Sequence, residues 1–247
     1  MKMSKTLSSI CALLLGFSLS LPTFAQQTVQ ADTTQQNRPV RGIQYSNDDA
    51  LAALRAKPLP LFSGVSVSAD LAGAILAVST AYGQYEAACR VNLKGRYFPV
   101  VEVGMGVSDH TDETTSIHYK TRAPYFRIGC DYNFAKDLRS GNRIFGGLRY
   151  GHSSFDYDLD GPAIVDPVYG TSTPFAYSGL KGSSHWLDFV FGLEAKIWSF
   201  FHLGWSMRYR VPLSNKASEI GDAWYVPGYG RSGGGVLTGT FNVIFDI

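Results

Sequence analysis

His152 and Ser154 are the residues of this sequence whose types and spacing come nearest to nucleophilic catalysis. A histidine can take the proton of a serine hydroxyl when a third group, usually a carboxylate, orients the imidazole ring. On a β-strand, two residues separated by one position lie on the same face. Asp188, on the next predicted strand, is expected to face the opposite side and cannot complete a triad. A non-enzymatic function is therefore preferred, with a hydrolase using His152 and Ser154 as the alternative.

Two polar segments contain residue types that bind metal ions. The segment 156–161 (DYDLDG) is similar to the start of an EF-hand loop, but position twelve is Pro167 where bidentate ligation requires a glutamate. A second segment has a spacing that matches no known ligand pattern: His110, Asp112, Glu113 and His118. We interpret both as polar loops and expect no metal and no cofactor.

In the segments that must position these residues, apolar and polar side chains alternate with a period of two. In Gln84 to Lys94 the odd positions, from Tyr85 to Leu93, are apolar, and almost all the even positions are polar. This alternation is typical of a β-strand with one apolar and one polar face. The same pattern recurs at 125–134, 187–197, 201–211 and 237–247, and more weakly at 61–73, 96–108 and 142–157.

These eight predicted strands are joined by connections that are alternately short and long. That asymmetry is typical of an antiparallel up-and-down transmembrane β-barrel of the outer membrane, which has short periplasmic turns and long external loops. We therefore predict an eight-stranded barrel over residues 61–247. A further hairpin at 163–177 is the alternative and would make ten strands.

The side chains themselves indicate which face is inside. Large apolar residues such as Phe189, Phe191 and Trp205 would overfill an eight-stranded barrel, so we expect them to contact lipid. The polar faces then line the lumen and bring together a nearly balanced set of charges: Glu86, Arg90, Lys94, Glu102, Arg127, Asp131, Arg149, Asp188, Glu194, Lys196, Arg208, Arg210 and Asp246. Buried charges need partners, so this set predicts an ion-paired plug and argues against an open pore.

Aromatic residues and cysteines add two expectations. A group of aromatic residues lies beside the predicted short turns, where rings suit a lipid headgroup boundary: Tyr97, Phe98, Phe134, Trp198, Phe200 and Phe201. Cys89 and Cys130 fall on apolar faces. A disulfide is possible in an exported protein, but two small buried thiols are the simpler expectation.

The first 60 residues differ from the rest. Residues 1–25 have the charged start, short apolar core and small-residue end of a signal peptide. Residues 26–60 read as a periplasmic linker with one short helix capped by Ser46. Cleavage after residue 25 leaves 20 of the 22 basic residues beside 20 acidic ones, so no basic surplus indicates nucleic acid.

Several segments together resemble a family of uncharacterised outer-membrane β-barrel proteins of Bacteroidota, a domain of unknown function. They are YGQYEAACRVNLKGRYFPVVEVG, HYKTRAPYFRIGCDYNF, LRYG, WYVPGYG and GTFNVIFDI. The resemblance covers about residues 61–247 and implies the outer membrane and a barrel, with no catalytic residues. The final strand, with Phe245 and Ile247, also resembles the signal read by the barrel-assembly machinery, although phenylalanine is the usual last residue. The His-x-Ser pair looks like that of outer-membrane lipid A deacylases.

We therefore expect an outer-membrane protein of structural or surface-interaction type, whose N-terminal extension lies in the periplasm. Its partners would be outer-membrane lipid, the assembly machinery and an external ligand or protein. Aromatic residues of the external loops either bind that partner or pack as a cap over the barrel: Tyr169, Phe175, Tyr177, Trp224, Tyr225 and Tyr229.

Overall fold

The structure is a computed structural model, and it describes residues 59–216 and 220–247. The predicted signal peptide and the helix expected after Ser46 lie outside the described residues. No helix in the described part of the chain is long and apolar enough to cross a membrane.

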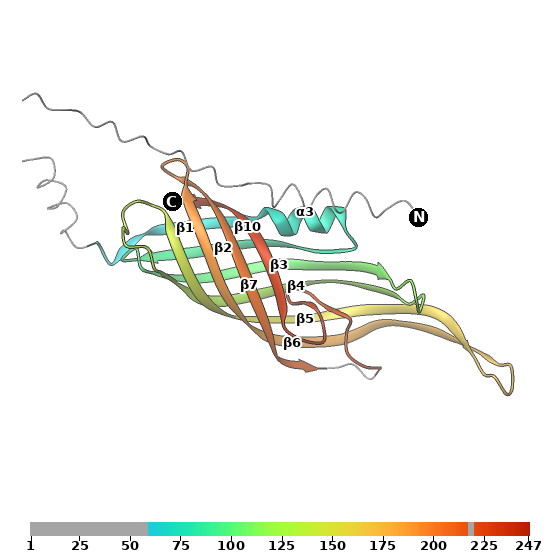
Figure 1. The fold of residues 1–247 in the computed structure, drawn as a ribbon. Helices are drawn as coiled ribbons and strands as arrows, with labels where there is room; N and C mark the ends of the chain where they lie inside the picture. The colour runs from blue at the N-terminus through green and yellow to red at the C-terminus, as the bar shows by residue number, and fades with distance from the viewer. Residues whose placement is uncertain (1–58, 217–219) are drawn as a thin grey trace, which may run out of the picture. The chain divides into compact units, whose positions relative to one another are not determined.

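Eight antiparallel strands close into a barrel in the order β1-β10-β7-β6-β5-β4-β3-β2, which confirms the predicted fold. Strand β10 closes the ring because it pairs with β1, from Ser66↔Asp246 to Asp70↔Asn242. The barrel strands are drawn in Figure 1: β1 (Phe62–Asp70), β2 (Tyr82–Leu93), β3 (Tyr97–Thr111), β4 (His118–Asn133), β5 (Arg143–Val165), β6 (Ser172–Lys196), β7 (Phe201–Lys216) and β10 (Val236–Asp246).

The alternative of ten strands, with a further hairpin at 163–177, does not hold. These residues lengthen β5 and β6, which remain paired as far as Val165↔Ser172. The two strands have 23 and 25 residues, whereas the other barrel strands have 9 to 16. They form a ribbon that projects beyond the other strands (Figure 1). We call residues 161–175 the β5–β6 ribbon.

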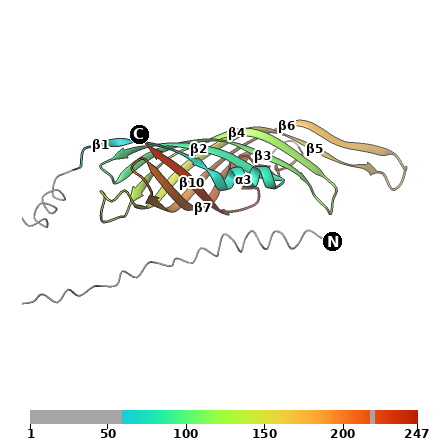
Figure 2. The same cartoon turned by 90° about the horizontal axis from the view of Figure 1, so that it is seen from above.

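A short helix, α3 (Leu71–Ser79), follows β1 where the sequence predicted the end of a strand and a loop. Asp70 is its N-cap, and its carboxylate accepts hydrogen bonds from the backbone N–H groups of Ala72 and Gly73. Because β1 stops at Asp70, α3 rather than a strand lies between β2 and β10 in this part of the wall (Figures 1 and 2).

The helix turns its small residues towards the wall and its large apolar residues outward. Gly73 is buried and Gly83 of β2 leaves no room for a side chain beside the Ala77 backbone. Leu71, Ile75, Leu76 and Val78 are exposed on the other side.

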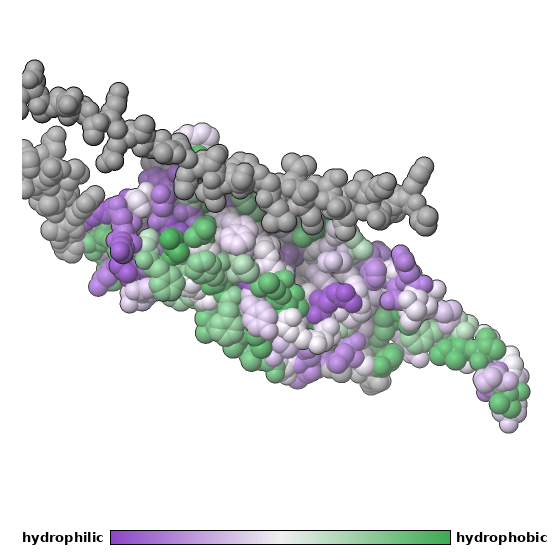
Figure 3. Space-filling view, viewed as in Figure 1, coloured by the Kyte–Doolittle hydropathy of each residue, from purple (hydrophilic) through white to green (hydrophobic). Residues whose placement is uncertain are grey.

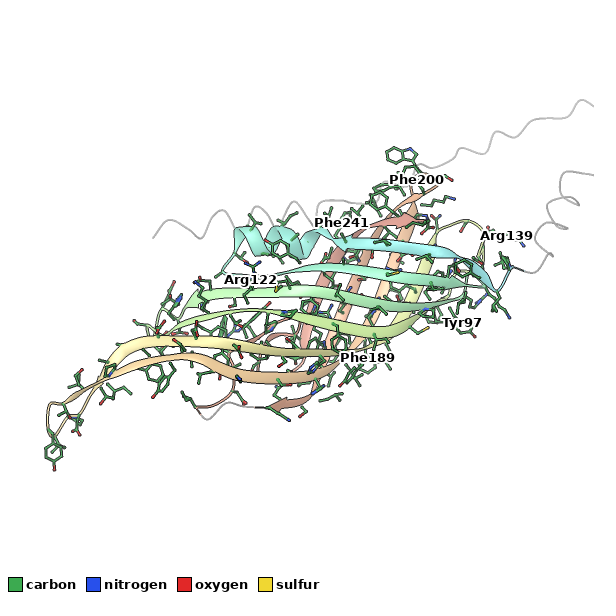
Figure 4. The ribbon with its side chains drawn as sticks, turned by 180° about the vertical axis from the view of Figure 1, so that it is seen from behind. Tyr97, Arg122, Arg139, Phe189, Phe200 and Phe241 are labelled. Atoms are coloured by element: carbon green, nitrogen blue, oxygen red, sulfur yellow. The ribbon has the colours of Figure 1, made fainter. Side chains whose placement is uncertain are left out.

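The outer surface of the barrel is apolar, whereas its interior combines buried charges with a cluster of buried aromatic residues. Exposed large side chains form a belt that includes Ile128, Phe189, Phe191, Leu193 and Trp205. Figure 3 shows one side of it, with hydrophobic residues across the middle and hydrophilic residues at the end with the short turns. Figure 4 places Phe189 and Phe241 over the middle, Tyr97 and Phe200 at the short-turn end, and Arg122 towards the loop end.

Two local expectations are corrected. Cys89 and Cys130 are free and exposed on the outer face, because that face points away from the protein interior. Of the rim aromatics, Tyr97, Phe134, Trp198 and Phe200 are exposed, whereas Phe98 faces inward and is buried beneath Arg143.

Candidate functional site

The lumen contains most of the buried charge in the described part of the chain. Six arginines are buried there: Arg90, Arg127, Arg143, Arg149, Arg208 and Arg210. Six carboxylates are buried with them: Asp70, Glu86, Glu102, Asp131, Asp188 and Glu194. The alternation of each strand brings these residues to one face, and closure of the barrel brings the strands' inner faces together.

Arg127, Arg149 and Arg208 surround two glutamates in the middle of the barrel. Arg127 forms ion pairs with Glu86 and with Glu102, the latter at 3.1 Å between Nη1 and Oε2. Arg208 Nη1 lies 2.7 Å from Glu86 Oε1 and 3.1 Å from Glu102 Oε2. Arg149 pairs with Glu102 as well. Each glutamate is therefore neutralised by more than one guanidinium.

The network extends to two aspartates. Arg149 donates two hydrogen bonds to Asp131, at 2.8 and 3.2 Å. Asp188 Oδ2 lies 3.0 Å from Arg127 Nε, and its other oxygen lies 4.0 Å from Arg210 Nε. The second distance is at the limit of an ion pair, so Arg210 is the least neutralised arginine of this group.

A second cluster lies towards the short-turn end. Glu194 pairs with Arg90 and with Arg143, whose Nη1 lies 3.0 Å from Glu194 Oε2. Arg143 also reaches Asp246 at 3.2 Å, and His202 Nε2 lies 3.0 Å from the same carboxylate. The two clusters together carry paired charges from the middle of the lumen to its short-turn end.

Two residues expected in this network are not part of it. Lys94 lies in the turn between β2 and β3 with a φ of 56°, and its side chain is exposed. Lys196 ends β6 and is exposed as well. Both are at strand ends, where a long flexible side chain reaches water at little cost.

Sequence reasoning missed Arg143 and His202. Arg143 shares a strand face with Arg149, six residues later, and His202 shares one with Arg208 and Arg210. Period-two counting extended to the strand ends would have found both residues.

A hairpin of the last loop, the cap hairpin (Tyr225–Arg231), closes the loop end of the lumen. It consists of β8 (Tyr225–Val226), β9 (Gly230–Arg231) and the turn between them. The Tyr119 hydroxyl donates to the carbonyl of Tyr225 at 2.7 Å, and the Tyr225 hydroxyl donates to Gly83 at 3.3 Å. Burial raises the pKa of the Tyr229 phenol.

The backbone of the cap hairpin contacts the arginines directly. Arg127 Nη2 donates to the carbonyl of Gly228 at 2.5 Å, and Arg210 Nη1 donates to the carbonyl of Tyr229 at 2.7 Å. The Tyr229 ring packs edge-on against buried Trp186. The cap is therefore continuous with the ion network beneath it.

The six loop aromatics separate into two groups. Tyr225 and Tyr229 are buried in the cap hairpin, and Trp224 stacks on His110 beside it. Tyr169 is 81% exposed near the turn of the β5–β6 ribbon. Phe175 and Tyr177, on β6, contact each other edge to face.

His152 and Ser154 both face the exterior. The His152 ring stacks on His185, which is its direct partner across the β5–β6 pair. Asp188 is buried in the lumen, on the other side of the wall. Among the described residues no hydrogen bond joins His152 to Ser154, and the Nδ1 atom of His152 has no partner. The arrangement gives no specific support to the hydrolase.

The two segments with metal-ligand types were expected to be loops, but 156–161 lies within β5, and His110 and His118 lie at the ends of β3 and β4. The Asp112 carboxylate accepts hydrogen bonds from the backbone N–H groups of Thr115 and Thr114, which lower the pKa of Asp112. Asp158 lies within β5 and accepts from the Gly179 N–H at 2.8 Å. In the described part of the chain, no group of three histidine, cysteine, aspartate or glutamate residues is placed to hold a metal ion.

Comparison with known families places the chain in one of them. The model of a domain of unknown function, DUF6048, matches residues 3–246. The chain belongs to the DUF6048 family. No curated protein matches this DUF6048 chain. Among solved structures, Acinetobacter baumannii CarO2 is similar at 11% identity and a TM-score of 0.34, covering 77% of this chain and 100% of that one. That likeness is too low to carry a functional argument.

Proposed function

We propose that this DUF6048 protein is a closed outer-membrane β-barrel that acts through its external surface rather than by catalysis or conduction. The observation that carries this proposal is the radial arrangement of the wall. Large apolar side chains cover the outside, and paired charges fill the inside. In water this arrangement would expose the apolar belt, whereas in a bilayer it places the apolar residues against lipid and keeps the charges together.

The proposed orientation follows from the connections. The connections after β2, β4 and β6 gather at one end of the barrel and are turns without a helix or strand of their own. The other end has α3 after β1, the projecting β5–β6 ribbon and the cap hairpin after β7. Short turns would face the periplasm, as they do in other outer-membrane barrels. Strand β10, with its alternating apolar residues, is the segment we expect the assembly machinery to recognise.

The β5–β6 ribbon is the proposed contact surface. It lies beyond the apolar belt and exposes four large apolar residues around its turn: Ile164, Val165, Val168 and Tyr169. Exposed apolar residues gathered on a projecting hairpin are typical of a surface that binds a partner.

Two measurements test the closed barrel. In planar bilayers the purified protein should produce no steady single-channel conductance, because the lumen is filled by ion pairs and the cap hairpin. In cells it should fractionate with the outer membrane and migrate faster in gels before boiling than after it. A steady ohmic conductance would contradict the plug, and recovery in the soluble fraction would contradict the membrane location.

Shortening the ribbon tests the contact surface. Asp160 and Ala176 are paired across β5 and β6, so residues 161–175 can be replaced by a two-residue turn at that pair. A second variant keeps the ribbon and changes its four exposed apolar residues to serine. Surface cross-linking on intact cells should lose the same cross-linked species in both variants. If both variants retain every species, the ribbon is not the contact surface.

A further inference from the structure

Arg210 is a buried cation whose surroundings are incomplete. Its side chain is 3% exposed, and among the described residues Asp188, at 4.0 Å, is the one carboxylate within ion-pair distance. Asp188 is already 3.0 Å from Arg127. The Nε and Nη2 atoms of Arg210 have no hydrogen-bond partner in the described part of the chain. Two guanidinium groups therefore share one carboxylate at the loop end of the network, and one of them has two unused donors.

Neutral backbone oxygens take the place that a second anion would occupy. The carbonyls of Gly228 and Tyr229, consecutive in the chain, accept from Arg127 Nη2 and Arg210 Nη1. A guanidinium matches the paired oxygens of a carboxylate or phosphate, with which it forms two parallel hydrogen bonds and a charge–charge attraction that a neutral carbonyl lacks. A carbonyl pair is thus a weaker substitute for an oxyanion at this position.

A glycine segment follows the cap hairpin. Gly233, Gly234 and Gly235 are consecutive, and within the described part of the chain nothing lies within 4 Å of a carbon added at Gly233 or Gly234. The segment is held at two points, because the Tyr229 hydroxyl donates to the carbonyl of Gly234 and Gly235 leaves no room for a side chain beside the Tyr209 ring. Once these contacts break, three glycines give the backbone many accessible conformations, so the hairpin can leave the barrel mouth by bending at this segment.

From these contacts we propose that Arg127 and Arg210 form an oxyanion-binding site, which the cap hairpin occupies in the closed state. The ligand group is a carboxylate or a phosphate that enters from the loop end and displaces the two carbonyls. The cap hairpin then competes with the ligand for the same two arginines. Removing the hairpin exposes a site that is already formed. This proposal rests on the proposed function in one respect only, namely that the ligand enters from the external side of the outer membrane.

The test compares full-length protein with a variant in which Tyr225–Arg231 is replaced by seven glycine and serine residues, both folded in detergent micelles. Inorganic phosphate is the probe in one calorimetric titration and acetate in the other, which distinguishes the two oxyanions. Sodium chloride at matched ionic strength is the control. Removing the competitor should strengthen binding of at least one oxyanion by about tenfold or more, since a site that is seldom open binds weakly.

Two substitutions in the hairpin-free variant locate the site. Arg210→Gln should abolish the gain, whereas Arg139→Gln, which removes one charge from a turn at the opposite end, should preserve it. In the full-length protein the same anion should accelerate hydrogen exchange of the amides at 225–231. The proposal is overturned if a folded hairpin-free protein binds neither anion more tightly than its Arg210→Gln form and exchange at 225–231 does not change.

These measurements in micelles do not depend on membrane orientation. If neither anion binds, the proposal of a closed outer-membrane barrel is not contradicted. If the protein proves to be soluble, the oxyanion site can still be tested in the same way.

Discussion

The carboxylate of Asp70, the last residue of β1, accepts a hydrogen bond from the backbone N–H of Phe241, on β10, at 3.2 Å. The same carboxylate caps α3, so one side chain joins the helix to the neighbouring strand. This bond matters because the ladders that β1 forms with β2 and with β10 end where α3 begins. A helix satisfies its own backbone groups and cannot pair with a strand edge. The wall at α3 therefore depends on side-chain contacts.

Replacing Asp70 should weaken this part of the wall. Asp70→Ala removes the cap and the bond to Phe241, and we expect it to lower the free energy of unfolding by about 1–2 kcal/mol. Asp70→Ser keeps a helix-capping oxygen, but the serine side chain is too short to accept the hydrogen bond from Phe241 as well. The loss of unfolding free energy should therefore be smaller than for Asp70→Ala. Urea titration in lipid vesicles measures both. Ser79→Ala, at the exposed end of the same helix, is the control, and an equal effect there would contradict the assigned role.

The close approach of α3 to β2 gives a second prediction. A methyl group at Gly83 would overlap the backbone of Ala77. Gly83→Ala should therefore push the helix from the wall and reduce stability by about 1–3 kcal/mol, as overpacking does elsewhere. Gly234→Ala is the matched control, because nothing lies within 4 Å of the added carbon. If the two variants have the same melting temperature, the contact of α3 with β2 is not needed to close the wall.

Helix α3 could not be distinguished from a strand by the sequence pattern. Alternation is a strong signal where the two faces differ, as in Phe126 to Asp131, and there it placed each residue on the correct side. The segment LAGAILAVS is apolar at nearly every position, so no period distinguishes a buried strand from a helix. Asp70 before this run was the available capping signal.

Contacts between strands that are distant in the chain could not be predicted from the sequence, for another reason. Alternation predicts that Arg127 and Glu86 face inward, but not that they meet, because they come from strands β4 and β2 and are joined by closure of the barrel. The lengths of β5 and β6 were underestimated because the pattern loses its apolar face beyond the belt. The cap hairpin was left open between a partner site and a cap because its aromatic residues fit either role.

Arg127 should be the most sensitive position of the ion network. Its side chain is fully buried and lies within ion-pair distance of Glu86, Glu102 and Asp188. Arg127→Met leaves those carboxylates short of one cation, and removing one partner of a buried pair typically costs about 3–5 kcal/mol. Lys136→Gln, in an exposed turn, should change stability by less than about 0.5 kcal/mol. The two variants can be compared by urea titration in the same vesicles. A loss below about 1 kcal/mol for Arg127→Met would mean that the network is not needed for stability.

The apolar belt makes a prediction that distinguishes a membrane barrel from a water-soluble one. Phe189 is 52% exposed over the middle of the belt, and Tyr97 is 51% exposed at the short-turn end (Figure 4). In a bilayer an arginine costs about 2–4 kcal/mol at the midplane and about 0–1 kcal/mol near the interface. Phe189→Arg should therefore destabilise the protein in lipid vesicles far more than Tyr97→Arg. The two side chains are almost equally exposed, so loss of protein contacts cannot account for such a difference. Equal losses for the two variants would indicate that the belt does not face hydrocarbon, and the proposed membrane location would have to be abandoned.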